Sequence, residues 1–175
     1  PAALARADAI LKAGGGSRGD AWLMHSGDKS CVFAPSGRSL VMYRRWGGLW
    51  IAMGGPVGPP DDRVEALMAF HAAADAGSAS PVVYAATEEL LLPLIDMGWS
   101  VRKIGETAVV QLASFSMEGA ARARMRQVLS RLGKRDGWQV QVRAPGETDD
   151  WDALERVSND WLARHTGREK AFSMG

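Results

Sequence analysis

The sequence is short of the residues and segments on which several classes of protein depend. It has one cysteine, Cys31, so no disulfide can form within the chain, and a reducing compartment is indicated. No apolar run approaches the roughly 20 residues of a membrane-spanning helix, and no secretory signal is visible. The net charge is only +1, which excludes a strong overall attraction to nucleic acid or membrane. No spacing of His, Cys and Asp suggests a metal site, and no cofactor is expected.

What is present indicates one domain with a core, or one domain and part of another. The chain has 175 residues, of which 46% are hydrophobic and 23% charged, as in ordinary globular proteins. The charge is distributed unevenly, because residues 1–117 hold ten Lys/Arg and eleven Asp/Glu, whereas residues 122–135 hold six basic residues and no acid. Because the chain lacks an initiator methionine and ends abruptly after a helix, we expect it to be a domain cut from a longer protein.

In the first half of the chain, the sequence predicts a group of strands after an opening helix, and then alternating helices and strands. Alternating or apolar runs bounded by Pro and Gly turns predict an antiparallel meander, with strands at 30–34, 40–44 and 49–53 after an opening helix at 2–12. A Gly/Pro loop at 54–60 then leads to a helix that Asp61 or Asp62 can cap. A strand at 81–85, a helix at 88–97 and strands at 99–104 and 107–112 follow. The middle strand–helix–strand of this whole order should be a parallel, right-handed crossover.

This order resembles the fold of GNAT acyltransferases. The resemblance covers roughly residues 30–112 and includes the helix that ends at Gly98-Trp99. It implies an α/β (α+β) fold, a mixed sheet with flanking helices. We expect a first GNAT-like unit at 1–117, a basic connecting helix at 118–136, and the start of a second unit at 137–175 that opens with a strand at 138–142.

The loop at 54–60 lies where GNAT proteins bind the pyrophosphate of coenzyme A through backbone amides. Glycines allow such an approach, but the proline residues of this loop lack N–H groups, and Asp61 and Asp62 would repel a phosphate. A rigid turn from strand to helix is therefore the favoured interpretation, and acetyl-coenzyme A chemistry is the alternative.

The basic helix predicts a surface for a polyanion. Its apolar stripe is formed by Met125, Val128, Leu129 and Leu132, and cations flank it on both sides. RNA phosphates or anionic lipid headgroups suit such a helix, and a solvated helix with paired arginines is the alternative. The candidate residues for tRNA or lipid headgroups are Arg122, Arg124, Arg126, Arg131, Lys134 and Arg135.

The end of the chain collects polar and charged residues after a helix. His165 is a better catalytic candidate than His25, which stands in a Ser-Gly-Asp loop. The segment 168–175 (Arg-Glu-Lys-Ala-Phe-Ser-Met-Gly), the motifs at 27–38 and 55–59, and the basic helix resemble the phosphatidylglycerol lysyltransferase (multiple peptide resistance factor) family. Gly55 replaces the family's usual Asp, so no role is carried over for that carboxylate.

The resemblance implies transfer of a lysyl or alanyl group from aminoacyl-tRNA to the glycerol hydroxyl of phosphatidylglycerol. For this chemistry we predict His165, Glu169 and Lys170 as catalytic residues, and as substrate-binding residues Arg168, Phe172, Ser173, Lys29 and Arg38. The implied partners are the tRNA, the lipid surface at the cytoplasmic face of the bacterial inner membrane, the remainder of the catalytic domain and an N-terminal transmembrane domain. A non-catalytic module that docks lipid or a protein is a further alternative, and the fragment alone is expected to be inactive.

Overall fold

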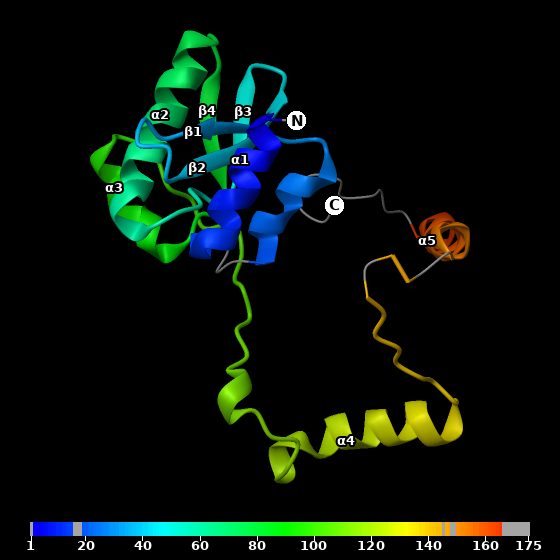
Figure 1. Cartoon of the computed structure of the whole chain (residues 1–175). Coiled ribbons are helices and arrows are strands. Elements are labelled where there is room, and N and C mark those ends of the chain that lie inside the picture. Colours follow the sequence, from blue (N-terminus) through cyan, green and yellow to red (C-terminus); the bar gives the residue numbers. More distant parts are fainter. Residues whose placement is uncertain (1, 16–18, 145, 148–149, 166–175) are drawn as a thin grey trace. The chain divides into compact units, whose positions relative to one another are not determined.

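The computed structural model describes residues 2–15, 19–144, 146–147 and 150–165 (Figure 1). These residues form two units, one reaching to Ile104 and the other beginning at Gly105. Each unit is described by itself below.

The first unit is built on a four-stranded mixed sheet. Its strands are β1 (Ser30–Phe33), β2 (Leu40–Trp46), β3 (Leu49–Met53) and β4 (Ser80–Tyr84), in the spatial order β1-β2-β3-β4. The first three strands pair antiparallel, with Tyr43 opposite both Ser30 and Ala52, and β4 lies parallel to β3. The predicted antiparallel meander is therefore confirmed, and so is the parallel pairing of the strands on either side of the helix that follows the Gly/Pro loop.

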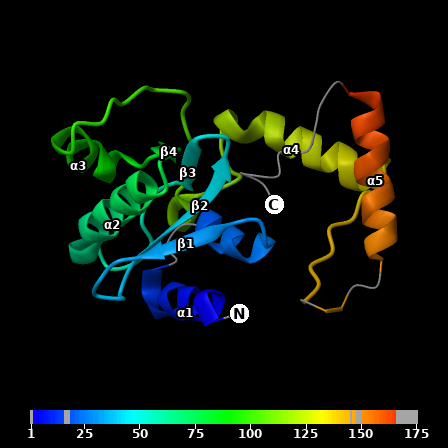
Figure 2. The ribbon, with the colours of Figure 1, turned by 90° about the horizontal axis from the view of Figure 1, so that it is seen from above.

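Helices cover both faces of this sheet (Figure 2). On one side lie α1 (Ala2–Ile10), a π turn (Leu11–Gly15) and a 3-10 helix (Gly19–Ser26). On the other lie α2 (Arg63–Ala76) and α3 (Leu91–Asp96), each preceded by a 3-10 turn (Pro60–Asp62 and Glu88–Leu90). His25 consequently stands in a helical turn rather than in the predicted loop, with Nε2 3.4 Å from a carboxylate oxygen of Asp8.

Each face of the sheet has its own apolar core. Under α2, the ring of Tyr43 stacks on Trp50 with centroids 4.5 Å apart and meets Phe70 at 5.6 Å. Phe70 is fully buried, and burial of such a side chain contributes about 1.5–3 kcal/mol. Under α1, Met42 and Leu40 pack with residues of α1 and the 3-10 helix. The predicted fold class, a mixed sheet with flanking helices, is confirmed.

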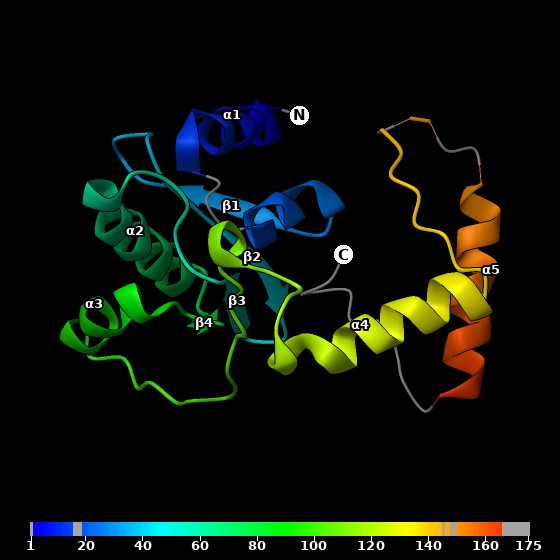
Figure 3. The same ribbon diagram turned by 90° about the horizontal axis from the view of Figure 1, so that it is seen from below.

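The second unit is helical where it is regular. A 3-10 turn (Ala120–Arg122), α4 (Ala123–Ser130) and a π turn (Arg131–Arg135) run in succession, and α5 (Trp151–Arg164) follows. Long stretches without regular secondary structure precede and follow α4, apart from a 3-10 turn at Leu112–Ser114 (Figure 3). The predicted basic helix is thus confirmed over most of its length.

Three predicted strands are wrong. Residues 99–104, 107–112 and 138–142 form no strand, although their sequences have the apolar content of one. Val140 and Val142 are 95% and 96% exposed, so the apolar side chains of this alternating segment do not pack against another element among the described residues. A strand needs a neighbour to hydrogen-bond with, and among the described residues the sheet ends at β4.

The aspartates before α2 do not cap it as predicted. Asp62 occupies the N-cap position but makes no side-chain cap hydrogen bond; its carboxylate accepts hydrogen bonds from Ser36 and Arg38 instead.

Within the described part of the chain, no helix is long and apolar enough to cross a membrane.

Candidate functional site

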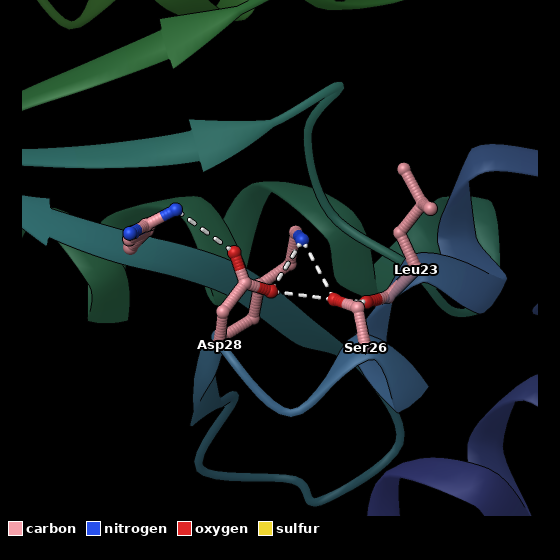
Figure 4. Close-up of polar contacts among 5 residues, drawn as sticks. Leu23, Ser26 and Asp28 are labelled. Atoms are coloured by element: carbon pink, nitrogen blue, oxygen red, sulfur yellow. Dashed lines mark hydrogen bonds and ion pairs between the residues drawn. The ribbon is translucent and has the colours of Figure 1, made fainter. Parts of the chain in front are cut away.

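Lys29 lies at the centre of a polar cluster at the start of β1. Its Nζ donates to Ser26 Oγ at 2.9 Å and to Asp28 Oδ1 at 2.8 Å, and its side chain has no exposed surface. Ser26 Oγ in turn donates to Asp28 Oδ1 and lies 2.6 Å from the carbonyl oxygen of Leu23 (Figure 4). Gly27, at φ +80°, makes the tight reversal that allows these contacts.

The carboxylate of Asp28 links this cluster to β2. Partial burial tends to raise the pKa of Asp28, but the hydrogen bonds from Lys29 and Ser26 outweigh it, so the pKa lies below its ordinary value. Asp28 therefore stays ionised near neutral pH, and its Oδ2 accepts from Arg44 at 3.1 Å. The cluster holds Arg44 in place while leaving 43% of its side chain exposed.

Arg38 lies in a second cluster, at the entry to α2. Its guanidinium donates to Asp61 at 3.0 Å and to Asp62 at 3.2 Å. The Ser39 hydroxyl, with Ser36 and the charge of Arg38, holds the pKa of the buried Asp62 below its usual range. Lys29 and Arg38, both predicted to bind substrate, therefore pair with different carboxylates and belong to separate clusters.

Two amides of the Gly/Pro loop that precedes α2 are already bonded within the protein. Gly54 N–H donates to the carbonyl of Tyr84 at 2.7 Å, and Val57 pairs with Leu40 in both directions at 2.8 and 2.9 Å. Gly54 to Gly58 are all buried. Amides that already bond to carbonyls cannot receive a pyrophosphate, so the coenzyme A alternative is not favoured.

The cationic side chains of the basic helix differ in what they contact. Arg126 donates to the carbonyls of Met117 and Gly119 at 2.6 and 2.7 Å, which ties down the segment before α4. Arg122 lies over the ring of Phe115 at 5.4 Å. Arg124 and Arg131 instead line a shallow hollow, together with Gln127 and Val128. Two guanidiniums and an amide around one hollow suit phosphate oxygens.

His165 follows the last residue of α5. Its ring stacks on Trp161 at 4.3 Å, and its Nδ1 lies 2.8 Å from the carbonyl oxygen of Trp161. Because a carbonyl only accepts, Nδ1 carries the proton, and in the neutral ring Nε2 has the free lone pair. The exposed imidazole is thereby oriented as a proton acceptor.

Some predicted site residues lie outside the described part of the chain, and two residues of the clusters and hollow above were not predicted from the sequence. Arg168, Glu169, Lys170, Phe172 and Ser173 lie outside the described residues. Lys134 and Arg135 are exposed in the last turn of the basic helix. Sequence reasoning missed Arg44 and Gln127. Arg44 breaks the apolar run of β2, which was a usable signal, whereas a single glutamine in a basic helix gave none.

Comparison with known proteins identifies the family. The family model described as phosphatidylglycerol lysyltransferase, C-terminal, matches residues 8–175. The chain belongs to this family. The family resemblance seen in the motifs of the sequence is thereby confirmed.

Relatives of this lysyltransferase family agree in sequence and in structure. The chain is 34% identical over 149 residues to the lysylphosphatidylglycerol biosynthesis bifunctional protein LysX of Nocardia farcinica, covering 84% of the chain and 13% of that protein. It is 28% identical to the phosphatidylglycerol lysyltransferase of Staphylococcus epidermidis, over 96% of the chain and 20% of the relative.

Two solved structures superpose closely on the chain. One is a C-terminal domain attributed to a lysylphosphatidylglycerol synthetase of Agrobacterium fabrum, with a TM-score of 0.87, 38% identity, and coverage of 98% of this chain and 54% of that one. The other is L-PGS from Bacillus licheniformis, with a TM-score of 0.84, 29% identity, and coverage of 97% and 53%. The chain therefore spans about half of these solved chains and a smaller share of the curated relatives.

Proposed function

We propose that this domain takes part in transferring an aminoacyl group, lysyl or alanyl, from its tRNA to phosphatidylglycerol. The observation that supports it most is the hollow on the basic helix, which Arg124 and Arg131 line, in a member of the phosphatidylglycerol lysyltransferase family. Both substrates carry phosphates, which these guanidiniums suit. The product would reduce the negative charge of the membrane and repel cationic peptides.

The chemistry is ester exchange. The glycerol hydroxyl attacks the aminoacyl carbonyl carbon, a new carbon–oxygen bond forms to the lipid, and the bond to the ribose oxygen breaks. The hydroxyl proton passes to a base, and the departing ribose oxygen takes a proton. Since the donor ester is already activated, positioning of the two substrates supplies much of the acceleration, and a base and an oxyanion donor supply more.

Named residues take the roles in this scheme. His165, with Nδ1 held by the Trp161 carbonyl, offers Nε2 as the base, or Glu169 orients the aminoacyl amine. Arg168 and Lys170 hold phosphate or carbonyl oxygens, and Phe172 and Ser173 contact substrate beside them. The contribution proposed for Lys29 is to order the turn that holds Arg44, because Lys29 has no exposed side-chain surface. Arg38 braces the loop before α2 through its two aspartates.

The setting proposed for the reaction is the cytoplasmic face of a bacterial inner membrane. Aminoacyl-tRNA is available on that side, and phosphatidylglycerol lies in that leaflet. The proposed partners in the same protein are the remainder of the catalytic domain and an N-terminal transmembrane domain.

The double substitution Arg124→Gln and Arg131→Gln tests the role of the hollow. We expect weaker tRNA binding and a salt dependence that is less steep by roughly 1.4 in log–log slope, at about 0.7 for each single-strand phosphate that is no longer neutralised. Arg156→Gln, an exposed arginine on α5, is the matched control and should leave the slope unchanged. Unaltered affinity and slope in the double variant would contradict the role of the hollow.

A further inference from the structure

The turn between β2 and β3 carries an unusual group of exposed side chains. Trp46 ends β2 with 71% of its surface exposed, and it stands opposite Leu49 across a two-residue turn. Gly47, at φ +55°, makes this turn. A Cβ atom added at Gly47 or Gly48 would meet no heavy atom within 4 Å, so the turn is open on its outer side.

Two arginines precede the tryptophan and are held by different contacts. Arg44 donates to Asp28 at 3.1 Å, within the cluster that also contains Lys29 and Ser26 (Figure 4). The Arg45 guanidinium lies 4.4 Å from the centre of the Trp50 ring, and no carboxylate among the described residues pairs with it. The rotamers of both arginines are therefore restrained while their charges stay near the surface.

An exposed tryptophan beside restrained arginines fits an anionic lipid surface. An indole ring has an apolar body and a polar N–H and favours the boundary between headgroups and acyl chains. Each basic residue close to an anionic membrane strengthens binding to that membrane by roughly fivefold. A nucleic acid would use the same charges and can also stack a base on an indole ring, so tRNA binding by the turn variants is measured beside vesicle binding.

We propose that the β2–β3 turn is a membrane contact, in which Trp46 enters the headgroup layer of a bilayer containing phosphatidylglycerol while Arg44 and Arg45 bind lipid phosphates. This inference deepens the proposed function and rests on it in one respect, namely that the lipid involved is phosphatidylglycerol. The contact holds the domain at the surface from which its lipid substrate comes. The turn belongs to the first unit, whereas the hollow on the basic helix belongs to the second.

Sedimentation with lipid vesicles tests this contact on the 175-residue chain itself. The vesicles are phosphatidylcholine with or without phosphatidylglycerol, and the variants are Trp46→Ala and Arg45→Gln. We expect each variant to bind phosphatidylglycerol vesicles about fivefold more weakly, and the chain to bind pure phosphatidylcholine poorly. Leu92→Ala and Arg102→Gln are the controls, because Leu92 is 72% exposed and Arg102 is exposed, and neither belongs to the turn.

A second readout separates contact from loss of folding. Brominated phosphatidylglycerol should quench part of the tryptophan fluorescence of the wild type, and that part should be missing in Trp46→Phe, which keeps an aromatic ring at the position. Wild-type affinity in the Trp46 and Arg45 variants would overturn the proposal. So would a loss of tRNA binding with vesicle binding intact, which would make the turn a nucleic-acid contact.

The inference and the proposed function can fail independently. If vesicle binding depends on the turn but no aminoacyl lipid forms in a transfer assay, the membrane contact stands and the transferase proposal fails. If aminoacyl lipid forms and the turn variants bind vesicles normally, the transferase proposal stands and the membrane contact is wrong.

Discussion

Gly58 shows how a single residue sets the geometry of the loop before α2. It adopts φ +142°, and an added Cβ would lie 2.2 Å from Ser39 Oγ and 2.7 Å from Ser39 Cα. Ser39 is fully buried and cannot withdraw. Its backbone carbonyl also accepts a hydrogen bond from Ala34 at 2.9 Å, which fixes the opposing chain.

We expect Gly58→Ala to lower the free energy of unfolding by about 2 kcal/mol or more, from backbone strain and overpacking together. Urea denaturation measures this. Gly48→Ala is the matched control, because a Cβ there meets nothing within 4 Å and its φ is not in the left-handed range. Equal stability of the two variants would show that the loop does not pack as described.

Asp62 is a buried carboxylate whose protonation should destabilise the first unit. Its side chain is 1% exposed and paired with Arg38, and its pKa is lowered from an ordinary value of 3.8 by Ser39, Ser36 and Arg38. A lowered folded-state pKa means that the carboxylate stabilises the fold above its unfolded pKa, and that this contribution disappears as the pH falls through the folded value.

Asp62→Asn should therefore be less stable than the wild type at neutral pH, and the difference should narrow as the pH falls below about 4. Thermal melts across the acid range measure it. Asp96→Asn replaces an exposed carboxylate at the end of α3 and serves as the control. A difference that stays constant at every pH would contradict an ionised, paired Asp62.

At the scale of whole elements, α2 holds the first unit together through the face it turns to the sheet. Phe70 is fully buried against Tyr43 and Trp50, whereas Met68, two residues earlier on the same helix, is 57% exposed. Phe70→Ala should lower the free energy of unfolding by about 3–5 kcal/mol, because apolar burial disappears and a cavity remains.

Met68→Ala should change stability by no more than about 0.5 kcal/mol. Circular dichroism during urea denaturation gives both values. A small effect of Phe70→Ala would mean that α2 is not anchored through this ring.

The elements that sequence predicts well are those whose partners are close in the chain. The strands at 30–53 are hairpin neighbours separated by short Pro and Gly turns, so their pairing follows from local signals. The segments at 99–112 and 138–142 have equally apolar sequences but no adjacent strand to pair with among the described residues. Propensity alone cannot supply a partner, and these residues are therefore exposed instead of forming strands.

In the candidate site, too, local sequence motifs predict individual residues but not the contacts between residues far apart in the chain. Local motifs predicted that Lys29 and Arg38 matter, and both are tied into ion-pair clusters. The contact of Asp28 with Arg44 joins residues 16 positions apart in the sequence, which no local pattern reveals. Likewise, no local pattern reveals that Arg126 donates to the carbonyl oxygens of Met117 and Gly119, nine and seven positions earlier.

At the scale of the whole molecule, we expect the two units to supply different functions to one reaction. The first unit is a layered sheet with a basic and aromatic turn between two of its strands. The second provides the arginine-lined hollow and the oriented imidazole of His165. Lipid contact and tRNA contact should therefore be separable by substitution, with Trp46 affecting the first and Arg124 and Arg131 the second.

Formation of aminoacylated lipid is the reaction on which the proposed function depends. The protein expressed from the complete reading frame that contains this chain is mixed with lysyl- or alanyl-tRNA and phosphatidylglycerol vesicles, and the lipids are analysed by mass spectrometry. We expect lysyl- or alanyl-phosphatidylglycerol, and less of it from the Arg124→Gln, Arg131→Gln double variant at the same tRNA concentration. A folded protein that makes no such product with either tRNA, and that binds coenzyme A in a calorimetric titration, would contradict the proposed transfer.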